Sequence, residues 1–462
     1  MPLAALPAPR GVPFFGNLLQ LDAKRAHLVL EAFARELGTP YRMRLRKRDM
    51  LVVSDPVAIA EVLRARPGVF RRGRPVESVF AEMGIAGVFS AEGRDWERQR
   101  RLVMRAFDPG HLRGYFPALS AVTGRLRRRW MAAAARGDAL DIQSELMRYT
   151  VDVTAGLAFG TDTNTLEHDD DLIQQHLEKV FPMLSRRMSS PFMYWRHFRL
   201  PADRALDANL ARIREAVDGF IAQARARLAA DPALREKPSN LIEALLAARD
   251  QPDSGFTDRD VSGNVFTALL AGEDTTANTL AWLCHFLARD PAAQAAMRSE
   301  ADAVLGDNPE LQDFARVQDL PYLDAATREA MRLKPVAPLL FFEANEPAQV
   351  GGIAVAPRTP VATLMRPAGL DPVLFPEPMA FRPRRWLEGD AESSRAAQRV
   401  LMPFGGGPRF CPGRYLALLE IRMVASMLAR NFTLHPAGGE PEERYNLSMM
   451  PLGLRVRLEA RA

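Results

Sequence analysis

The sequence predicts a mainly α-helical protein with small peripheral β-sheets. Apolar residues recur every three or four positions in many segments, which is the spacing of one helix face. One such pattern continues from Thr257 to Asp290, which is longer than most helices of globular proteins. Alternating apolar and polar residues, which indicate strands, occur in short stretches near residues 41–53 and 446–459.

The first half of the chain is expected to hold a series of helices and one hairpin. In the hairpin, "YRMRL" alternates apolar and polar residues and is followed across a charged turn by "MLVV". The helices are expected at residues 26–37, 55–65, 92–107, 115–135, 141–158, 169–186 and 203–229.

The second half begins with the long helix. Thr257 is followed three residues later by Asp260, a pattern typical of a capping box, and Pro291 marks the end of the helix. Further elements are expected in this order: helices at 291–305 and 322–333, a Pro-rich irregular region to about residue 400, a helix from Pro412 to about Arg430, and a final hairpin between 446 and 459.

Composition favours one large globular domain over residues 1–462. The chain has 47% hydrophobic residues and neither a long linker tract nor a repeat. The net charge is +5, and the basic residues are scattered along the chain, so no nucleic-acid partner is expected. Two cysteines cannot form a disulfide framework, and prolines at positions 2, 7, 9 and 13 interrupt the N-terminal apolar stretch. We therefore expect a soluble cytoplasmic protein without a membrane anchor.

One of the two cysteines lies in "PFGGGPRFCPGR", residues 403–414. Glycines and prolines surround Cys411, which indicates irregular backbone that approaches something closely. Because Pro412 suits the first position of a helix, the sulfur is expected to face free N–H groups and the positive helix end, which favour a thiolate. The helix that follows is apolar on nearly all sides, so the thiolate is expected to be buried and to need a counter-charge.

Two interpretations of Cys411 stay open at this point. Zinc is disfavoured because the chain has no CxxC or HExxH motif and Cys284 lies far away in the sequence. A single thiolate suits haem iron, which brings its other ligands in the porphyrin. The alternative is a structural cysteine packed in a turn, and the loop by itself favours neither interpretation.

The long helix favours the haem interpretation, because polar residues interrupt its apolar sequence. A glycine inside a helix costs about 1 kcal/mol relative to alanine, and buried carboxylates cost more unless they are paired. We expect the glycine to widen the helix groove for dioxygen or water, with Asp274 and Thr275 relaying protons. A solvated helix face is the alternative, and it fits an apolar sequence poorly. The polar run consists of Gly272, Glu273, Asp274, Thr275 and Thr276.

Arginines in "GRDWERQRRLVMRAF" fall on two faces of an expected helix. Arg100 shares one stripe with Trp96, Val103 and Phe107. Arg100 therefore points inward and requires a buried anion, for which a haem propionate would serve. The opposite stripe is either a solvated face or a docking site for an acidic protein. It consists of Arg94, Arg98, Arg101 and Arg105.

A further charged cluster is expected around "TREAMRL". Glu329 and Arg332 are three residues apart and share a helix face, and Arg385 could complete the cluster. An ion pair at this spacing is common and by itself carries no functional information.

Together these residues resemble the cytochrome P450 monooxygenases over essentially the whole chain. "FGGGPRFCPG" fits the Phe-x-x-Gly-x-Arg-x-Cys-x-Gly signature of that family, "AGEDTT" its oxygen-activating segment, "EAMR" its Glu-x-x-Arg pair and "WERQR" its Trp-x-x-x-Arg helix. The resemblance implies the P450 fold, with haem b buried between the long central helix and the helix after Cys411.

The resemblance also implies roles for individual residues. Cys411 would be the iron ligand, and Asp274 and Thr275 would be the catalytic acid and alcohol. Glu329, Arg332 and Arg385 would form a structural triad behind the haem. The implied haem-binding residues are Trp96, Arg100, Ala271, Phe404, Arg409, Cys411 and Gly413.

The implied activity is insertion of one atom of O2 into a C–H bond of a small hydrophobic substrate. The sequence has no GxGxxG loop and no flavin domain, so electrons from NAD(P)H are expected through a separate ferredoxin or flavodoxin with its reductase. The segments "VESVFAEMGIAGVF" and "PFMYWRHF", with Leu339 and Leu340, would form a pocket wall and lid, or be ordinary packing. A haem-thiolate sensor and a peroxide-driven oxidase are the alternatives.

One position departs from the family pattern. Members usually carry a basic residue near the position of Phe342, as a further propionate partner, and this chain has Phe342 followed by Glu343. We expect haem binding to survive and the haem orientation or redox potential to differ from the family norm.

Overall fold

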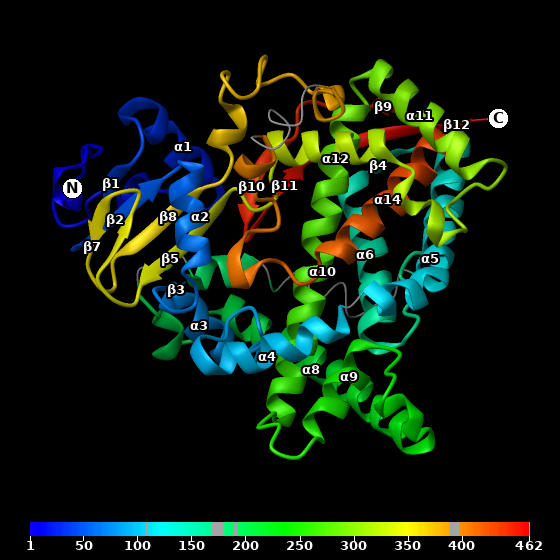
Figure 1. The fold of residues 1–462 in the computed structure, drawn as a ribbon, viewed down its shortest axis with the longest axis horizontal. Coiled ribbons are helices and arrows are strands. Elements are labelled where there is room, and N and C mark those ends of the chain that lie inside the picture. Colours follow the sequence, from blue (N-terminus) through cyan, green and yellow to red (C-terminus); the bar gives the residue numbers. More distant parts are fainter. Residues whose placement is uncertain are drawn as a thin grey trace. The chain divides into compact units, whose positions relative to one another are not determined.

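A computed structural model describes residues 1–107, 109–168, 180, 182–188, 190, 192–388 and 397–461. The described chain is mainly helical, with four small sheets, as predicted (Figure 1). It divides into two compact units. One comprises residues 1–78, 328–411 and 443–450, and the other comprises 79–327, 412–442 and 451–462.

The first unit is built on a five-stranded sheet with the strand order β1-β2-β8-β5-β3. β2 and β8 are parallel, and the other neighbours are antiparallel. The predicted hairpin of β1 and β2 is confirmed, with Tyr41 opposite Val52. The strands are β1 (Tyr41–Leu45), β2 (Arg48–Val53), β3 (Phe70–Arg72), β5 (Leu339–Ala344) and β8 (Pro360–Leu364). Two shorter strands, β6 (Ala348–Val350) and β7 (Ile353–Val355), pair separately.

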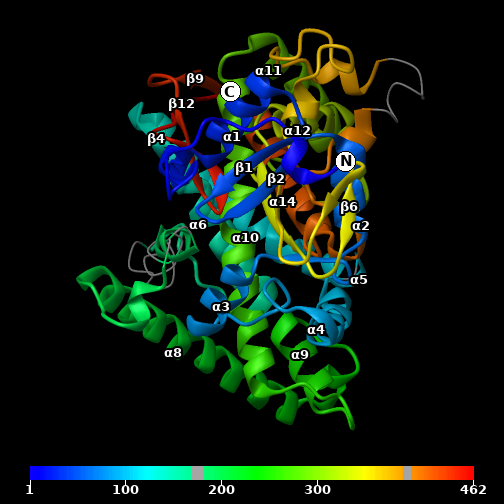
Figure 2. The same ribbon diagram turned by 90° about the vertical axis from the view of Figure 1, so that its left-hand side faces the viewer.

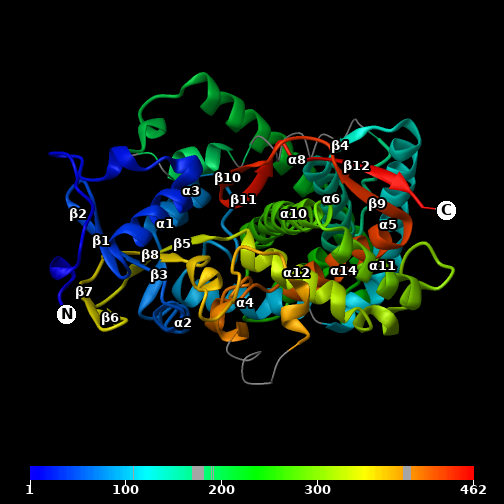
Figure 3. The ribbon, with the colours of Figure 1, turned by 90° about the horizontal axis from the view of Figure 1, so that it is seen from above.

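Two helices cover opposite faces of this sheet. Along β2, Met50 and Val52 pack with α1 (Ala26–Leu37), whereas Leu51 and Val53 pack with α2 (Pro56–Arg64). This alternation is the two-residue period of a strand buried on both sides. Figure 3 shows the sheet edge-on with these helices beside it.

A largely buried ionic cluster also holds the first unit together. Glu443 accepts hydrogen bonds from Lys334 and from Arg366 (2.8 Å), and it lies 3.1 Å from His27 Nε2. Burial alone would raise the pKa of Glu443, but the His27 hydrogen bond and the positive charges of Arg366 and Lys334 hold it well below its usual value. The cluster therefore ties α1 to residues far along the chain.

The second unit is a helical assembly in which α10 (Asp258–Leu287) contacts α6, α8, α9 and α14. Its small sheet has the order β4-β12-β9. Figure 2 shows α10 in green, running lengthwise along this unit. The other elements are α4 (Gly93–Ala106), α5 (Pro109–Arg136), α6 (Ile142–Phe159), α8 (Pro201–Ala230), α9 (Leu241–Arg249), α11 (Pro291–Leu305), α14 (Arg414–Asn431), β4 (Ala139–Asp141), β9 (Phe432–Pro436) and β12 (Arg455–Ala460). Two helices, α3 (Arg74–Glu82) and α12 (Pro321–Leu333), have residues in both units.

The long helix confirms its predicted start and stop. Thr257 Oγ1 accepts the Asp260 N–H at 3.2 Å, and the Asp260 carboxylate accepts the Thr257 N–H at 2.8 Å, so the capping box is complete. Pro291 begins α11. None of the described helices is long and apolar enough to cross a membrane.

The predicted strands and irregular regions needed more correction than the helices. The final hairpin at 446–459 is wrong, because β11 (Ser448–Leu452) pairs with β10 (Glu442–Asn446), while β12 lies between β4 and β9. The region expected to be irregular contains β5 to β8, and helices α3 and α9 were not predicted. The helix expected at 169–186 falls largely outside the described residues, although 182–186 are helical.

Candidate active site

The loop containing Cys411 is held against the end of α2 by its backbone. Gly407 has a φ of 63°, and a Cβ added there would lie 2.3 Å from the carbonyl oxygen of Leu63. Only glycine tolerates both conditions. The Cys411 N–H donates to the Phe404 carbonyl at 2.9 Å and closes the loop. Phe404, Arg409 and Cys411 are all partly exposed.

The two cysteines differ sharply in accessibility. Cys284 lies in α10 with 1% of its surface exposed, and this burial raises the pKa of its thiol to about 12. Cys411 is only partly buried, which corrects the expectation of a buried sulfur. Cys411 is therefore the thiol that a ligand could reach.

The junction between the loop and α14 corrects one expectation. Pro412 and Gly413 form a turn, and the helix begins at Arg414 with Gly413 as its N-cap. The helix therefore starts two residues later than predicted, and Cys411 is correspondingly further from its first turn. The predicted burial of this helix is confirmed, since most residues from Leu416 to Ala429 are buried.

One turn of α10 is open on one face. Between residues 261 and 288, Ala271 and Thr275 are the only exposed residues. They lie four positions apart, so they share a helix face, and Thr275 Oγ1 donates to the Ala271 carbonyl at 3.0 Å. A small side chain and an alcohol are thus accessible on one face of a helix that is otherwise largely buried.

Asp274 is buried and hydrogen-bonded, unlike its neighbour Thr275. Asn278 Nδ2 donates to Asp274 Oδ1 at 2.8 Å, and Gln143 Nε2 of α6 donates to Asn278 Oδ1 at 3.3 Å. These bonds offset part of the cost of burying a carboxylate. The sequence did not single out Asn278, although its spacing of four from Asp274 was a usable signal, and nothing local pointed to Gln143.

Gly272 has a packing role that the sequence did not predict. A Cβ at Gly272 would lie 2.6 Å from Thr154 Oγ1, so the glycine allows α6 to approach α10 closely. Thr150 Oγ1 of α6 also donates to the Glu273 carbonyl at 2.8 Å. The open face therefore lies at Ala271 and Thr275, while Gly272 contacts α6.

The two predicted stripes of α4 are confirmed in part. Trp96, Arg100 and Val103 are buried, so Arg100 does point inward. Arg94, Arg101 and Arg105 are exposed. Arg98 is a correction, because its guanidinium donates to the Gly255 carbonyl and pairs with Asp95 and Asp260. The exposed stripe therefore has three members rather than four.

The predicted charge cluster around Glu329 is confirmed, and it has more members than expected. Glu329 accepts two hydrogen bonds from Arg332, at 2.7 and 2.9 Å, and one from Arg385 Nε at 2.9 Å. Trp386 Nε1 and the Arg382 N–H also donate to Glu329, at 2.9 and 3.0 Å. Arg332 and Glu329 are fully buried, so each neutralises the other in the interior.

Two arginines lie beside Phe342, where the resemblance predicts a basic residue that this chain lacks. Phe342 is buried in β5, and the Arg66 guanidinium lies over its ring, 4.7 Å from the centroid. Arg72 of β3 is the direct cross-strand partner of Phe342. Glu343 is paired with Arg74 at 3.1 Å. Neither Arg66 nor Arg72 was singled out from the sequence, because both precede Phe342 by more than two hundred residues.

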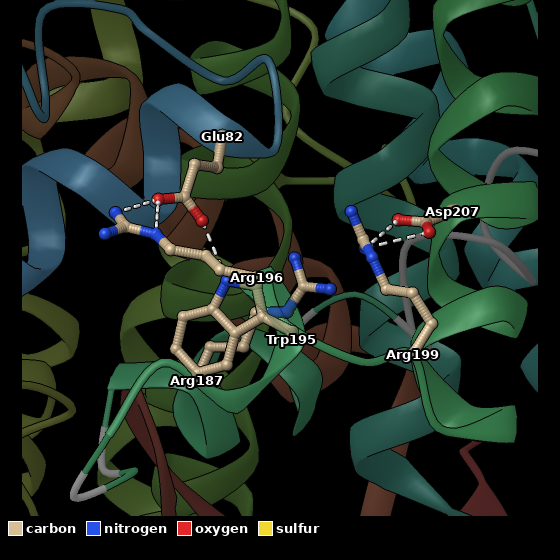
Figure 4. A pocket seen from close by; sticks show the side chains of 6 residues that line it. All are labelled: Glu82, Arg187, Trp195, Arg196, Arg199 and Asp207. Carbon is tan, nitrogen blue, oxygen red and sulfur yellow. Dashed lines mark hydrogen bonds and ion pairs between the residues drawn. The ribbon is translucent and has the colours of Figure 1, made fainter.

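The two segments expected to form a pocket wall and lid meet in the structure. Trp195 Nε1 donates to Glu82 Oε2 at 2.7 Å, and Arg196 Nε donates to Glu82 Oε1 at 2.8 Å (Figure 4). Next to this contact lies a pocket with a polar lining, which is a poor match for a hydrophobic substrate. It is lined by Glu82, Arg187, Trp195, Arg196, Arg199 and Asp207. Leu339 is fully buried in the core of the first unit.

A mainly helical fold and a signature cysteine in a glycine-rich loop before a long buried helix define the class of this protein. The family model for cytochrome P450 matches residues 6–457. The chain therefore belongs to the cytochrome P450 family, and it is an oxidoreductase of the monooxygenase type. The family implies a haem cofactor.

Relatives of the chain come from bacteria, plants, fungi and animals. Cyclooctatin synthase of Streptomyces melanosporofaciens is 30% identical over 96% of this chain and 94% of its own. Cyclooctat-9-en-7-ol 5-monooxygenase of the same organism is 28% identical, over 94% and 90%. Cytochrome P450 3A28 of Bos taurus is 25% identical, over 98% and 92%.

The Glu329 cluster gives a stability prediction. Glu329→Gln leaves Arg332 buried beside a neutral amide, so we expect the free energy of unfolding to fall by about 3–5 kcal/mol. Thermal and denaturant unfolding measure the effect. Asp319→Asn is the control, because it breaks the exposed Arg316–Asp319 pair of the same spacing and should cost at most about 1 kcal/mol. Equal losses in the two variants would contradict the importance of this buried pair.

Proposed function

We propose that the protein is a haem-thiolate monooxygenase that inserts one atom of O2 into a C–H bond of a small hydrophobic substrate. The main support is two local features, one in each compact unit. A backbone-held loop leaves Cys411 reachable, and α10 has one open turn at which Thr275 lies beside the buried Asp274. Membership of a monooxygenase family supports the same reaction.

The residues of the chain fit haem b better than a bare metal ion. Among the described residues no group of three or more His, Cys, Asp or Glu could hold a metal ion by itself. A lone thiolate suits iron that has its remaining ligands from a porphyrin. When bound, haem would supply the iron on which dioxygen is reduced.

We assign the binding residues from the family motif. Cys411 would be the iron ligand, and Trp96, Arg100 and Arg409 would hold the propionates. Ala271, Phe404 and Gly413 would complete the surroundings of the haem. Burial of Trp96 and Arg100 on the inner face of α4 supports their part in this assignment. We also propose that Arg66 and Arg72 supply the charge missing at Phe342, while a shifted haem orientation or potential stays a prediction.

Asp274 and Thr275 would hold and move protons. The buried Asp274 carboxylate is oriented by Asn278, and the Thr275 hydroxyl lies at the open turn. An alcohol at that position can pass a proton to a ligand beside the exposed turn and be resupplied from the acid.

Electrons from NAD(P)H would arrive through a ferredoxin or flavodoxin with its reductase. Exposed Arg94, Arg101 and Arg105 on α4 would attract an acidic partner. A cytoplasmic location, a single haem domain over residues 1–462 and the absence of a nucleic-acid partner also stay predictions. For a first substrate screen we would include cyclooctat-9-en-7-ol, because the name of one relative contains it.

The iron ligand is tested by comparing the two cysteines. Cys411→Ser should remove the thiolate and with it the thiolate-specific absorption band of the ferrous carbon monoxide complex. Cys284→Ser is the matched control and should leave that band unchanged, since Cys284 is buried within α10. An unaltered spectrum in Cys411→Ser would refute the proposed function.

The proton route is tested with Thr275→Val and Asp274→Asn. We expect product formation with NAD(P)H and reductase to fall about 100-fold, while peroxide release per NAD(P)H rises. Thr279→Val is the control, because its hydroxyl donates to the Thr275 carbonyl inside the protein. A protein that works with peroxide alone would form product with added peroxide but none with NAD(P)H and reductase, and a sensor would form no product under either condition.

The proposed docking of a redox partner on the exposed α4 arginines is tested with Arg101→Glu. We expect slower reduction by the partner, by about tenfold at low salt and less at high salt, with substrate affinity unchanged. Arg212→Glu reverses an exposed arginine of α8 and is the control. Equal reduction rates in the wild type and Arg101→Glu would show that the α4 arginines are merely solvated.

A further inference from the structure

The N-terminal loop of the first unit carries an exposed apolar tip. Phe14 is 92% exposed, and Leu19 (68%), Phe15 (48%) and Val12 (44%) are exposed in the same loop. Scattered single apolar residues are normal on a protein surface, but a cluster with two aromatic rings indicates contact with something outside the chain.

The backbone holds this tip outward. Val12 and Gly16 exchange two backbone hydrogen bonds of 2.9 Å, and Phe14 at the tip has a φ of 65°. This is the left-handed region, which a bulky side chain rarely adopts. The turn therefore presents the Phe14 ring at a cost in backbone energy, which suggests a use for it.

The loop is joined to the edge of the sheet. The Arg46 N–H donates to the Phe15 carbonyl at 3.1 Å, and the Asn17 N–H donates to the Arg44 carbonyl at 2.6 Å. The β1–β2 turn therefore lies directly beside the apolar tip. Figure 3 shows the N-terminal segment alongside β1 and β2.

The surroundings of the tip are cationic. Residues 9–20 and 43–48 contain no acidic residue. Asp49, which follows the turn, is already paired with Arg42 at 3.0 Å. The basic residues in these two segments are all exposed, and they are Arg10, Arg44, Arg46, Lys47 and Arg48.

We propose that this apolar tip and its cations bind the surface of an anionic lipid bilayer. Aromatic side chains favour the boundary between headgroups and acyl chains, and basic residues near the surface add attraction to anionic lipids. A protein partner or a second copy of the chain would require a broader complementary face than a protruding turn offers. The contact is peripheral, with Phe14 and Phe15 entering the headgroup region and the cations pairing with lipid phosphates.

Vesicle sedimentation of the full-length protein tests the proposal. The wild type should sediment with vesicles of phosphatidylcholine and phosphatidylglycerol and not with phosphatidylcholine alone. The double variants Phe14→Gly/Phe15→Ser and Arg46→Asn/Lys47→Gln should each lower the bound fraction by about tenfold. Glycine relieves the strained φ at position 14, and asparagine tolerates the φ of 55° at Arg46, so both variants should fold.

Val373→Ser is the control, since Val373 is 86% exposed outside the tip and should not affect sedimentation. Equal binding of the wild type and both double variants would overturn the proposal, as would absence of binding to the anionic vesicles. A concentration-dependent dimer that Phe14→Gly/Phe15→Ser abolishes, without vesicle binding, would assign the tip to a second copy instead. The assay needs neither haem chemistry nor a redox partner, so its outcome is independent of the proposed function.

Discussion

The position of the Cys411 sulfur depends on the backbone contact between its loop and the end of α2. At Gly407 the chain has positive φ and lies so close to the Leu63 carbonyl that no Cβ fits. The Cys411 N–H bond to Phe404 fixes the other side of the loop. The thiol is thus positioned by main-chain geometry, which varies less than side-chain packing. Under the proposed function, this support would set the direction of the iron ligand before the cofactor binds.

A second constraint is the run of polar residues within the otherwise apolar helix α10. A carboxylate inside a buried helix is costly, and here Asn278 and Gln143 offset the cost by a chain of hydrogen bonds from Asp274 to α6. The neighbouring alcohol at Thr275 does not share this burial, because it lies on the open turn. Two adjacent residues therefore have opposite environments. Under the proposed function this difference is useful, since an acid held inside the protein can resupply an alcohol that meets the ligand.

Local signals made much of the fold and part of the site predictable. The bounds of α1, the capping box at Thr257 and the inward direction of Arg100 depend on neighbours within a few positions. What failed depends on partners far along the chain. β5 was missed because the residues around it are Pro-rich and its pairing strands, β3 and β8, lie elsewhere in the sequence. The final hairpin was wrong because β12 pairs with β4 and β9 instead of its neighbour. Arg98 fits an exposed stripe by spacing, and only the fold brings Asp260 to it.

The same limit explains why a motif position can mislead about charge. In the sequence, Phe342 stands where the family pattern has a basic residue. Read across the sheet, the register places Arg72 opposite Phe342, and the Arg66 guanidinium stacks on its ring. A cation over an aromatic face is stabilised by the ring, so the Phe342 phenyl group can orient the Arg66 guanidinium. Under the proposed function, this region would require a positive charge at one place in the fold. Arg72 of β3 and Arg66, just after α2, would supply the charge that β5 lacks.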